Sequence, residues 1–179
     1  MTTPGLYAQI LGSAFDELSP ILKRIHDGRT PKLYSGRCEV ARGQGWMVRL
    51  ISHLARLPEP HSDVEVTIAI DGATSGEVWT RHFGGREMRS SLRNAAGMLQ
   101  ERLGPITFKF ALSADTHRID WRLREALLFG LLPLPRAWFK TCEARESIVE
   151  GRYHFDVRAE LLGMGALVHY RGWLVEHEG

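Results

Sequence analysis

The sequence contains only two cysteines, Cys38 and Cys142, among its 179 residues. Two cysteines cannot build a disulfide framework, so we expect both to be unpaired, buried thiols in different strands. Long apolar runs are also missing, because no stretch reaches the roughly 18 residues of a transmembrane helix. The N-terminal residues MTTPGL lack the basic region and the apolar run of a secretory signal. These absences predict a reduced, cytoplasmic protein without a transmembrane segment.

Lysine is scarce, and arginine supplies most of the 23 basic side chains. The basic residues are scattered along the chain and nearly balanced by 21 acidic ones, which leaves a formal net charge of +2. A nucleic-acid-binding protein would gather its basic residues on one face or in one run. We therefore expect no nucleic-acid partner.

Motifs for metals and nucleotides are absent. The eight histidines show no H-E-x-x-H spacing, and there is no C-x-x-C pair or dense acidic loop, so we expect no metal site. Neither G-x-x-x-x-G-K-[ST] nor G-x-G-x-x-G occurs, so we expect no cofactor. No catalytic signature stands out from the sequence either.

The clearest pattern in the sequence is a ladder of short alternating segments between about residue 63 and residue 176. Turn signals rich in Gly, Asp and Asn separate these segments roughly every 8–12 residues, a spacing typical of all-β sandwiches and barrels. Between the turns, apolar and polar residues alternate with period two. Tyr153, Phe155 and Val157, for example, alternate with polar neighbours. One apolar face and one polar face indicate an antiparallel sheet.

Helical spacing precedes and interrupts this ladder. Residues 6–26 predict two short helices, because Ser19-Pro20 provides an N-cap followed by proline at the first helical position. A first strand is expected over residues 33–41. Residues 46–57 then predict an amphipathic helix that ends before Pro58, with its inward side chains being Val48, Ile51, Leu54 and Ala55.

Together these elements predict a single domain over residues 1–179 with a mainly β, β-rich α+β fold. Many consecutive strands rarely stay open, because unpaired edges invite aggregation. We therefore expect an antiparallel β-barrel or half-barrel of about 8–10 strands, with N-terminal helices and one helix after the first strand. The residues expected to pack together in its core are Phe108, Phe110, Trp121, Leu123, Tyr153, Phe155 and Val157.

The strand at residues 166–176 mixes polar and apolar side chains on both faces, as expected between a core and a second enclosed surface. Ligand pockets are mostly apolar and carry a few convergent polar groups. The candidate ligand contacts are therefore His169, Tyr170, Arg171 and Trp173 on this strand, with Trp79 and Arg81 from an earlier one. The alternative is a structural hydrogen-bond network, since buried polar groups are normally paired.

His154 and Asp156 complete the set of candidate ligand-binding residues. They share one strand face, and a histidine beside an aspartate is the beginning of a general-base arrangement. The alternative is a solvent-facing charge ladder paired with the segment at residues 118–122. No nucleophile is linked to His154 by spacing, so we assign no catalytic residue.

One segment breaks the ladder: residues 127–139 read LLFGLLPLPRAWF. It is too short to span a bilayer, and its two prolines exclude a regular helix or a central strand. Three interpretations remain open for it. It is a buried irregular connection, an apolar lip over a cavity, or a docking patch for a membrane surface or a partner.

Several motifs, in the same order along nearly the whole chain, resemble the domain-of-unknown-function family 4166. They are LYAQILGSAFDELSPILKRIHDG, WTRHFGGREMRSSL, QERLGPITFKFAL, LLFGLLPLP, GRYHFDVRAEL and YRGWL. The resemblance implies a bacterial standalone domain. In other proteins, related domains are joined to reductases of the saccharopine-dehydrogenase type. The resemblance also implies a reductase as a partner. It transfers neither a cofactor nor catalytic residues.

The hypothesis for function is a binding module that holds a small apolar or amphipathic ligand inside a β-barrel. One alternative is an enzyme that acts on such a molecule through His154 and Asp156, or through His169 and Arg171. The other is a structural or interaction domain that partners a reductase. An internal cavity would separate the first two hypotheses from the third. The oligomeric state is left open.

Overall fold

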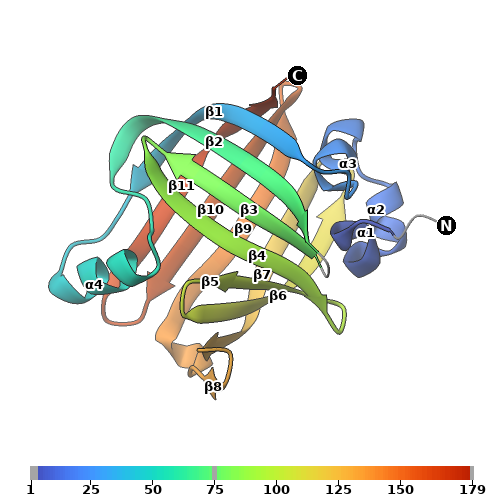
Figure 1. Ribbon diagram of the computed structural model, residues 1–179. Helices are drawn as coiled ribbons and strands as arrows, with labels where there is room; N and C mark the ends of the chain where they lie inside the picture. Colours follow the sequence, from blue (N-terminus) through green and yellow to red (C-terminus); the bar gives the residue numbers. More distant parts are fainter. Residues whose placement is uncertain (1–3, 74–75, 178–179) are drawn as a thin grey trace.

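The computed structural model describes residues 4–73 and 76–177. The strands in these ranges form one antiparallel sheet in the order β6-β5-β4-β3-β2-β1-β11-β10-β9-β7-β8. In addition β6 pairs with β7, which joins the two ends of the sheet and closes ten strands into a barrel (Figure 1). The prediction of an antiparallel β-barrel or half-barrel is therefore confirmed, and the structure shows that the barrel is closed.

Each barrel strand is connected to the next along the chain, so the connections alternate between the two ends of the barrel. Glycines fill several of these turns, as at Gly84-Gly85, where both residues have positive φ angles. The predicted turn at residues 71–76 lies partly outside the described residues. The strands are β1 (Lys32–Ala41), β2 (His61–Ala73), β3 (Gly76–Phe83), β4 (Arg86–Ala95), β5 (Met98–Leu103), β6 (Ile106–Asp115), β7 (Arg118–Leu128), the short extra β8 (Leu132–Pro133), β9 (Phe139–Val149), β10 (Arg152–Leu161) and β11 (Gly165–Glu176).

Alternate residues of each strand point into the barrel and form its core. Phe155 of β10 is buried, which confirms the register predicted for that strand, because a slip by one residue would expose it. The aromatic rings of Phe110 and Trp121 pack against each other in a tilted arrangement, with centroids 5.6 Å apart. Of the seven predicted core residues, five are fully buried, and Phe108 and Val157 are partly buried against them.

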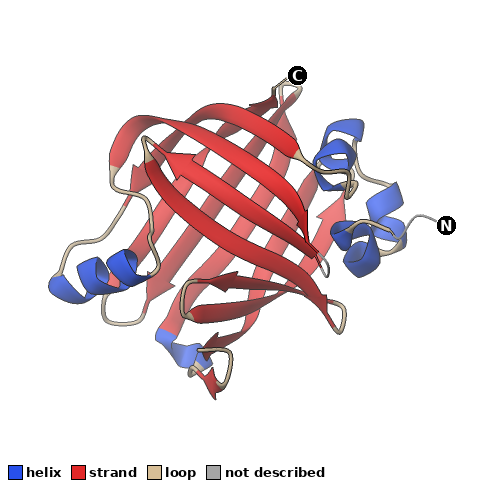
Figure 2. Cartoon of the chain, in the orientation of Figure 1, coloured by secondary structure: helices blue, strands red, loops and turns tan. Residues whose placement is uncertain are grey.

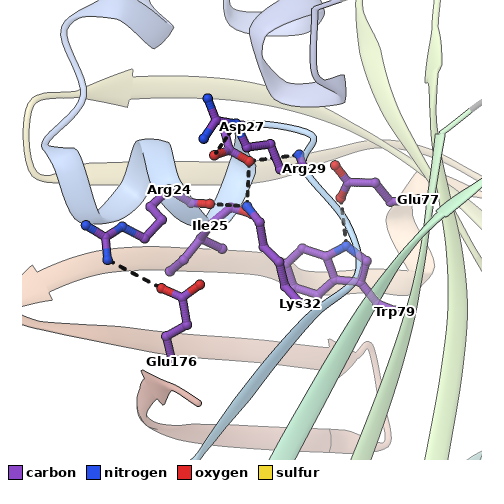
Figure 3. Close-up of polar contacts among 8 residues, drawn as sticks. All are labelled: Arg24, Ile25, Asp27, Arg29, Lys32, Glu77, Trp79 and Glu176. Carbon is purple, nitrogen blue, oxygen red and sulfur yellow. Dashed lines mark hydrogen bonds and ion pairs between the residues drawn. The ribbon is translucent and has the colours of Figure 1, made fainter. Parts of the chain in front are cut away.

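Three short helices cover one end of the barrel: α1 (Leu6–Leu11), α2 (Ser13–Asp16) and α3 (Pro20–His26) (Figure 2). Helix α3 begins at Pro20, as predicted. Its C-terminus is held by Lys32, whose Nζ donates to the Ile25 carbonyl oxygen at 3.2 Å and pairs with Asp27 Oδ1 at 2.6 Å (Figure 3). A cation at this position complements the helix dipole. The first residue of the barrel thus anchors the helices to it.

Helix α4 (Trp46–Leu54) lies at the opposite end, between β1 and β2 (Figure 1). Val48 and Ala55 are buried and Ile51 is half-buried, as predicted. The inward placement of Leu54 is wrong, because its side chain is 56% exposed. Successive residues of a helix are 100° apart, which places Ser52 closer than Leu54 to the direction of Val48 and Ala55. Ser52 is accordingly fully buried.

The segment at residues 127–139 ends β7, forms β8 and then turns through the short 3-10 helix η1 (Arg136–Trp138). Its interpretation as a buried connection is wrong for most of its length, since Phe129, Leu131, Leu132 and Trp138 are all more than half exposed. Only Leu134 and Phe139 pack against the core. The two prolines end regular pairing here, so the apolar side chains stay outside the barrel.

Candidate functional site in the barrel interior

A cavity of about 120 Å³ lies inside the barrel. Its wall is mostly aromatic and aliphatic and includes Trp79, Phe110, Trp121 and Phe155 from four strands. Side chains of Ile51 and Ala55, on and just after α4, line it from the opposite end to α1, α2 and α3. The interior is therefore not completely filled by its own side chains.

Arg81 is the basic group on the inner face of β3. Its side chain is only 8% exposed, and its guanidinium carbon lies 5.0 Å from the centre of the Trp79 ring. Nη1 donates to Ser90 Oγ at 2.8 Å, and Nη2 donates to Glu101 Oε1 at 3.4 Å. Burial is the largest single influence and disfavours the charge on the guanidinium, but Glu101 together with Tyr170, Tyr7 and Tyr153 outweighs it, so the pKa of Arg81 is raised. Arg81 is therefore a buried, permanently charged group at the cavity wall.

A second polar group closes the cavity toward the helices. His26 of α3 is fully buried, and its Nε2 is hydrogen-bonded to Glu146 Oε2 of β9. The His26 ring stacks on Tyr7 of α1, with centroids 3.6 Å apart, and lies 5.9 Å from the Trp79 ring. Burial and the Glu146 carboxylate raise the pKa of Tyr153. The hydrogen-bonded pair of His26 and Glu146 therefore connects the helices to the barrel wall.

Several buried polar atoms near this pair have no hydrogen-bond partner among the described residues. They are Tyr7 Oη, His26 Nδ1 and Trp121 Nε1. Buried polar groups in proteins are normally satisfied by protein or by ordered water.

Glu77 is the third buried carboxyl group of the interior. Its Oε2 accepts a hydrogen bond from Trp79 Nε1 at 2.8 Å (Figure 3). Burial raises the pKa of Glu77 above its ordinary value of 4.5, although this hydrogen bond and the nearby His26 and Lys32 act in the opposite direction. The folded protein therefore holds a proton on Glu77 at pH values where the unfolded chain has lost it.

Glu77→Gln is expected to stabilise the protein in a pH-dependent way. With a raised pKa in the folded state, Glu77 contributes stability that is fully present below about pH 4.5 and lost as the pH rises through the raised pKa. Glutamine keeps an oxygen for Trp79 and has no charge to bury. The gain over the parent should be absent at low pH and grow as the pH rises, by about 1.4 kcal/mol for each pKa unit of the shift. Urea unfolding at a series of pH values measures it.

The matched control is Glu150→Gln, at an exposed turn between β9 and β10. Its difference from the parent should not change with pH over the same window. A gain for Glu77→Gln that is equal at every pH would show that its effect comes from packing and not from titration.

The eight residues predicted to contact a ligand lie in two separate places. Trp79, Arg81 and Tyr170 line the internal cavity. The others point outward from β10 and β11. These are His154, Asp156, His169, Arg171 and Trp173, of which all but His169 line an open groove on the outer wall.

The outward residues are engaged with each other and with their neighbours. His169 Nε2 is 2.9 Å from Asp156 Oδ1. Arg171 pairs with Glu39 of β1 at 3.0 Å. One face of β11 therefore points into the barrel and carries Tyr170, and the other face is a charged outer surface that carries His169 and Arg171.

Sequence analysis did not identify Glu77, Glu101 or Glu146 as interior groups. The signal is present, because each lies two residues from an apolar side chain of the inward face: Glu77 beside Trp79, Glu101 between Leu99 and Leu103, and Glu146 between Ala144 and Ile148. Alternate residues of a strand share one face, so a carboxylate at a position whose neighbours on that face are apolar indicates a buried acid. His26 had no such signal, since it reaches Glu146 from a helix 120 residues away.

Both cysteines are free, as predicted. Burial raises the pKa of the Cys38 and Cys142 thiols to about 12. Within residues 4–73 and 76–177, no group of three His, Cys, Asp or Glu side chains is placed to hold a metal ion. No helix in the described part of the chain is long and apolar enough to cross a membrane.

Comparison with known protein families gave a match that covers most of the chain. The family described as "Domain of unknown function (DUF4166)" matches residues 18–174. The chain belongs to this family. Comparison with curated proteins gave no match. Among solved structures, the crystal structure of Rv2717c from M. tuberculosis is similar over 90% of this chain and 99% of that one, with 11% identity and a TM-score of 0.49. The reductase partner and the cytoplasmic location stay predictions.

Proposed function

We propose that this member of the family binds one small, largely apolar molecule inside the barrel, and that Arg81 holds an anionic group of that molecule. The observation that carries the proposal is a buried guanidinium at the wall of a mostly aromatic and aliphatic cavity, whose wall also includes the carboxyl groups of Glu101 and Glu146. A charge removed from water is costly unless it is paired. Arg81 is paired with Glu101 at the long distance of 3.4 Å, so its guanidinium can take a closer anionic partner in the adjacent cavity.

The volume limits the size of the ligand. An apolar cavity of about 150 Å³ engineered into another protein holds benzene. The cavity here is somewhat smaller, at about 120 Å³, so a single ring or a short chain is the largest ligand that it can take unless side chains move. Aromatic side chains make up much of its wall, and they pack well against a flat ring.

Arg81 retains donors for such a ligand. Its contacts with Ser90 and Glu101 use two of the five N–H donors of a guanidinium. The contact with Glu101 is long, at 3.4 Å, whereas charge-assisted hydrogen bonds are typically about 2.7–2.9 Å. A ligand carboxylate therefore has a stronger geometry available to it than Glu101 uses.

Titration with benzoate and with uncharged benzyl alcohol tests the proposal, with tryptophan fluorescence and thermal unfolding as readouts. Trp79 and Trp121 line the cavity and report on its occupancy. Benzoate should bind the parent more tightly than benzyl alcohol does. It should stabilise the protein by about 2.7 kcal/mol at a hundredfold excess over its dissociation constant.

Variants of the charged pair should change benzoate affinity in opposite directions. Arg81→Met removes the anion partner and should weaken benzoate binding by about tenfold to a hundredfold, in line with hydrogen bonds to charged groups. Glu101→Gln removes the competing carboxylate and should strengthen it. Arg171→Met, on the outer face of β11, is the matched control and should leave it unchanged. The proposal is overturned if neither probe binds the parent, or if Arg171→Met weakens binding as much as Arg81→Met.

A further inference from the structure

Exposed apolar side chains gather at one end of the barrel. Of the twelve large hydrophobic side chains that are exposed in the described residues, nine lie at the end that carries α4. We name these nine the apolar rim: Trp46, Met47, Leu50, Leu54, Phe129, Leu131, Leu132, Trp138 and Leu162. An exposed apolar surface concentrated in this way marks an interaction site.

Three separate segments contribute to the rim, and backbone hydrogen bonds brace two of them, the connection at residues 129–138 and the β10–β11 turn. Phe129 N donates to the Pro105 carbonyl oxygen at 2.7 Å, which ties the β7–β8 connection to the β5–β6 turn. Leu162 N donates to the Trp138 carbonyl oxygen at 2.8 Å, which ties the β10–β11 turn to η1. Figure 1 shows α4 and β8 projecting from the barrel at this end. The apolar groups therefore lie on protrusions.

The charge of this end is positive. Its connecting segments are residues 42–60, 84–85, 104–105, 129–138 and 162–164, and they hold four arginines, Arg42, Arg49, Arg56 and Arg136, but one acid, Glu59. The helical end has no such excess of basic residues. Residues 4–31 hold three basic and three acidic residues, Lys23, Arg24 and Arg29 against Asp16, Glu17 and Asp27, and the described turns at residues 96–97, 116–117 and 150–151 add only the acidic Glu150.

The one acid at the α4 end is already neutralised. Glu59 pairs with Arg42 and Arg86, at 2.7 Å in each case. Arg49 and Arg56, in contrast, make no ion pair with any described residue. Two unpaired cations thus stand beside the exposed apolar face of α4.

We infer that the apolar rim docks this protein on the surface of a membrane that contains anionic lipids. Amphipathic helices with Trp and Leu on one face and arginine beside it lie in the lipid interface, where the apolar groups enter and the cations meet lipid headgroups. Tryptophan is also enriched at this interface, and the rim holds Trp46 and Trp138. Protruding apolar groups suit a deformable lipid surface, whereas a folded protein partner would need a complementary groove.

The rim lies at the end of the barrel where Ile51 of α4 and Ala55, just after α4, belong to the cavity wall. Docking would place that end of the barrel against lipid. The inference does not depend on the proposed ligand, because membrane binding is measured with no small molecule present.

Co-sedimentation with vesicles tests the inference. One set is pure phosphatidylcholine, and the other is an equal mixture of phosphatidylcholine and phosphatidylglycerol. The protein should bind the anionic vesicles, and added salt should weaken the binding. Arg49→Gln/Arg56→Gln should lower the partition coefficient by about fivefold for each arginine. Trp46→Ala/Leu131→Ala should lower it by roughly tenfold or more.

Matched controls come from the opposite end of the barrel. Arg24→Gln/Arg29→Gln removes two exposed arginines there, and Leu33→Ala/Val149→Ala removes exposed apolar groups. Neither control should change vesicle binding. The inference is overturned if the parent fails to bind anionic vesicles, if the controls weaken binding as much as the rim variants, or if the rim instead forms a dimer that the rim variants dissociate on size exclusion.

Discussion

Gly36→Ala is expected to destabilise the protein by about 3 kcal/mol or more, at the upper end of the range for overpacking a closely fitted site. Gly36 lies in β1, opposite β11, the pairing that joins the first and last strands of the barrel. A methyl group at Gly36 would overlap the carbonyl oxygen of Trp173 on that neighbouring strand. Backbone cannot rotate away as a side chain can, so the two strands would have to separate.

Urea unfolding of Gly36→Ala and of a control, Gly163→Ala, measures this effect. Gly163 lies in the β10–β11 turn with a φ of +77° and with no atom within 4 Å of the added carbon. Its replacement should cost only the left-handed backbone penalty of about 1–2 kcal/mol. Gly36 itself lies outside the left-handed region, so a loss for Gly36→Ala no larger than that for Gly163→Ala would contradict the close approach of β11 as its cause.

Period-two alternation, regular turn spacing and the need to pair strand edges together predicted an antiparallel barrel or half-barrel. In strands such as β10, the apolar residues face a common core and the polar ones face solvent, so the local pattern and the tertiary fold carry the same information. Ser19-Pro20 likewise predicted the start of α3, because proline fits the first turn of a helix. Closure followed from the need to pair every edge, and the β6–β7 pairing provides it.

The segment at residues 127–139 shows where this kind of inference fails. Its apolar side chains predict burial when apolarity is the only criterion, yet Leu131 is 86% exposed. Composition alone cannot distinguish an apolar group buried in a core from one held out for another surface. The two prolines showed that the segment leaves the sheet, but not on which side its side chains would lie.

The candidate site was predictable in part. Trp79 and Arg81 share the inward parity of β3, and sequence reasoning selected both. On β11, both faces mix polar and apolar groups, so parity could not separate the inward Tyr170 from the outward His169 and Arg171. Contacts between distant elements carry no local signal at all, and the His26–Glu146 pair is the main example.

His26→Leu is expected to cost about 3–5 kcal/mol, the range for removing one partner of a buried polar pair. His26 and Glu146 are both almost completely inaccessible to solvent, with side chains 0% and 5% exposed. Without the imidazole, the Glu146 carboxyl group would remain buried with its main partner gone. The variant would also lose the stacking of His26 on Tyr7. Chemical unfolding measures the loss, and His117→Leu, at an exposed turn, is the control.

The double variant His26→Leu/Glu146→Leu measures how strongly the two side chains are coupled, when its loss of stability is compared with the losses of the two single variants. Replacing both partners by apolar groups removes the unsatisfied polar atoms, so its cost should be clearly smaller than the sum of the two single losses. Such coupling means that the helices are held to the barrel through a group that also lines the cavity, since Glu146 belongs to its wall. Additive losses would contradict this, and the attachment of α1 and α3 would then rest on their apolar contacts alone.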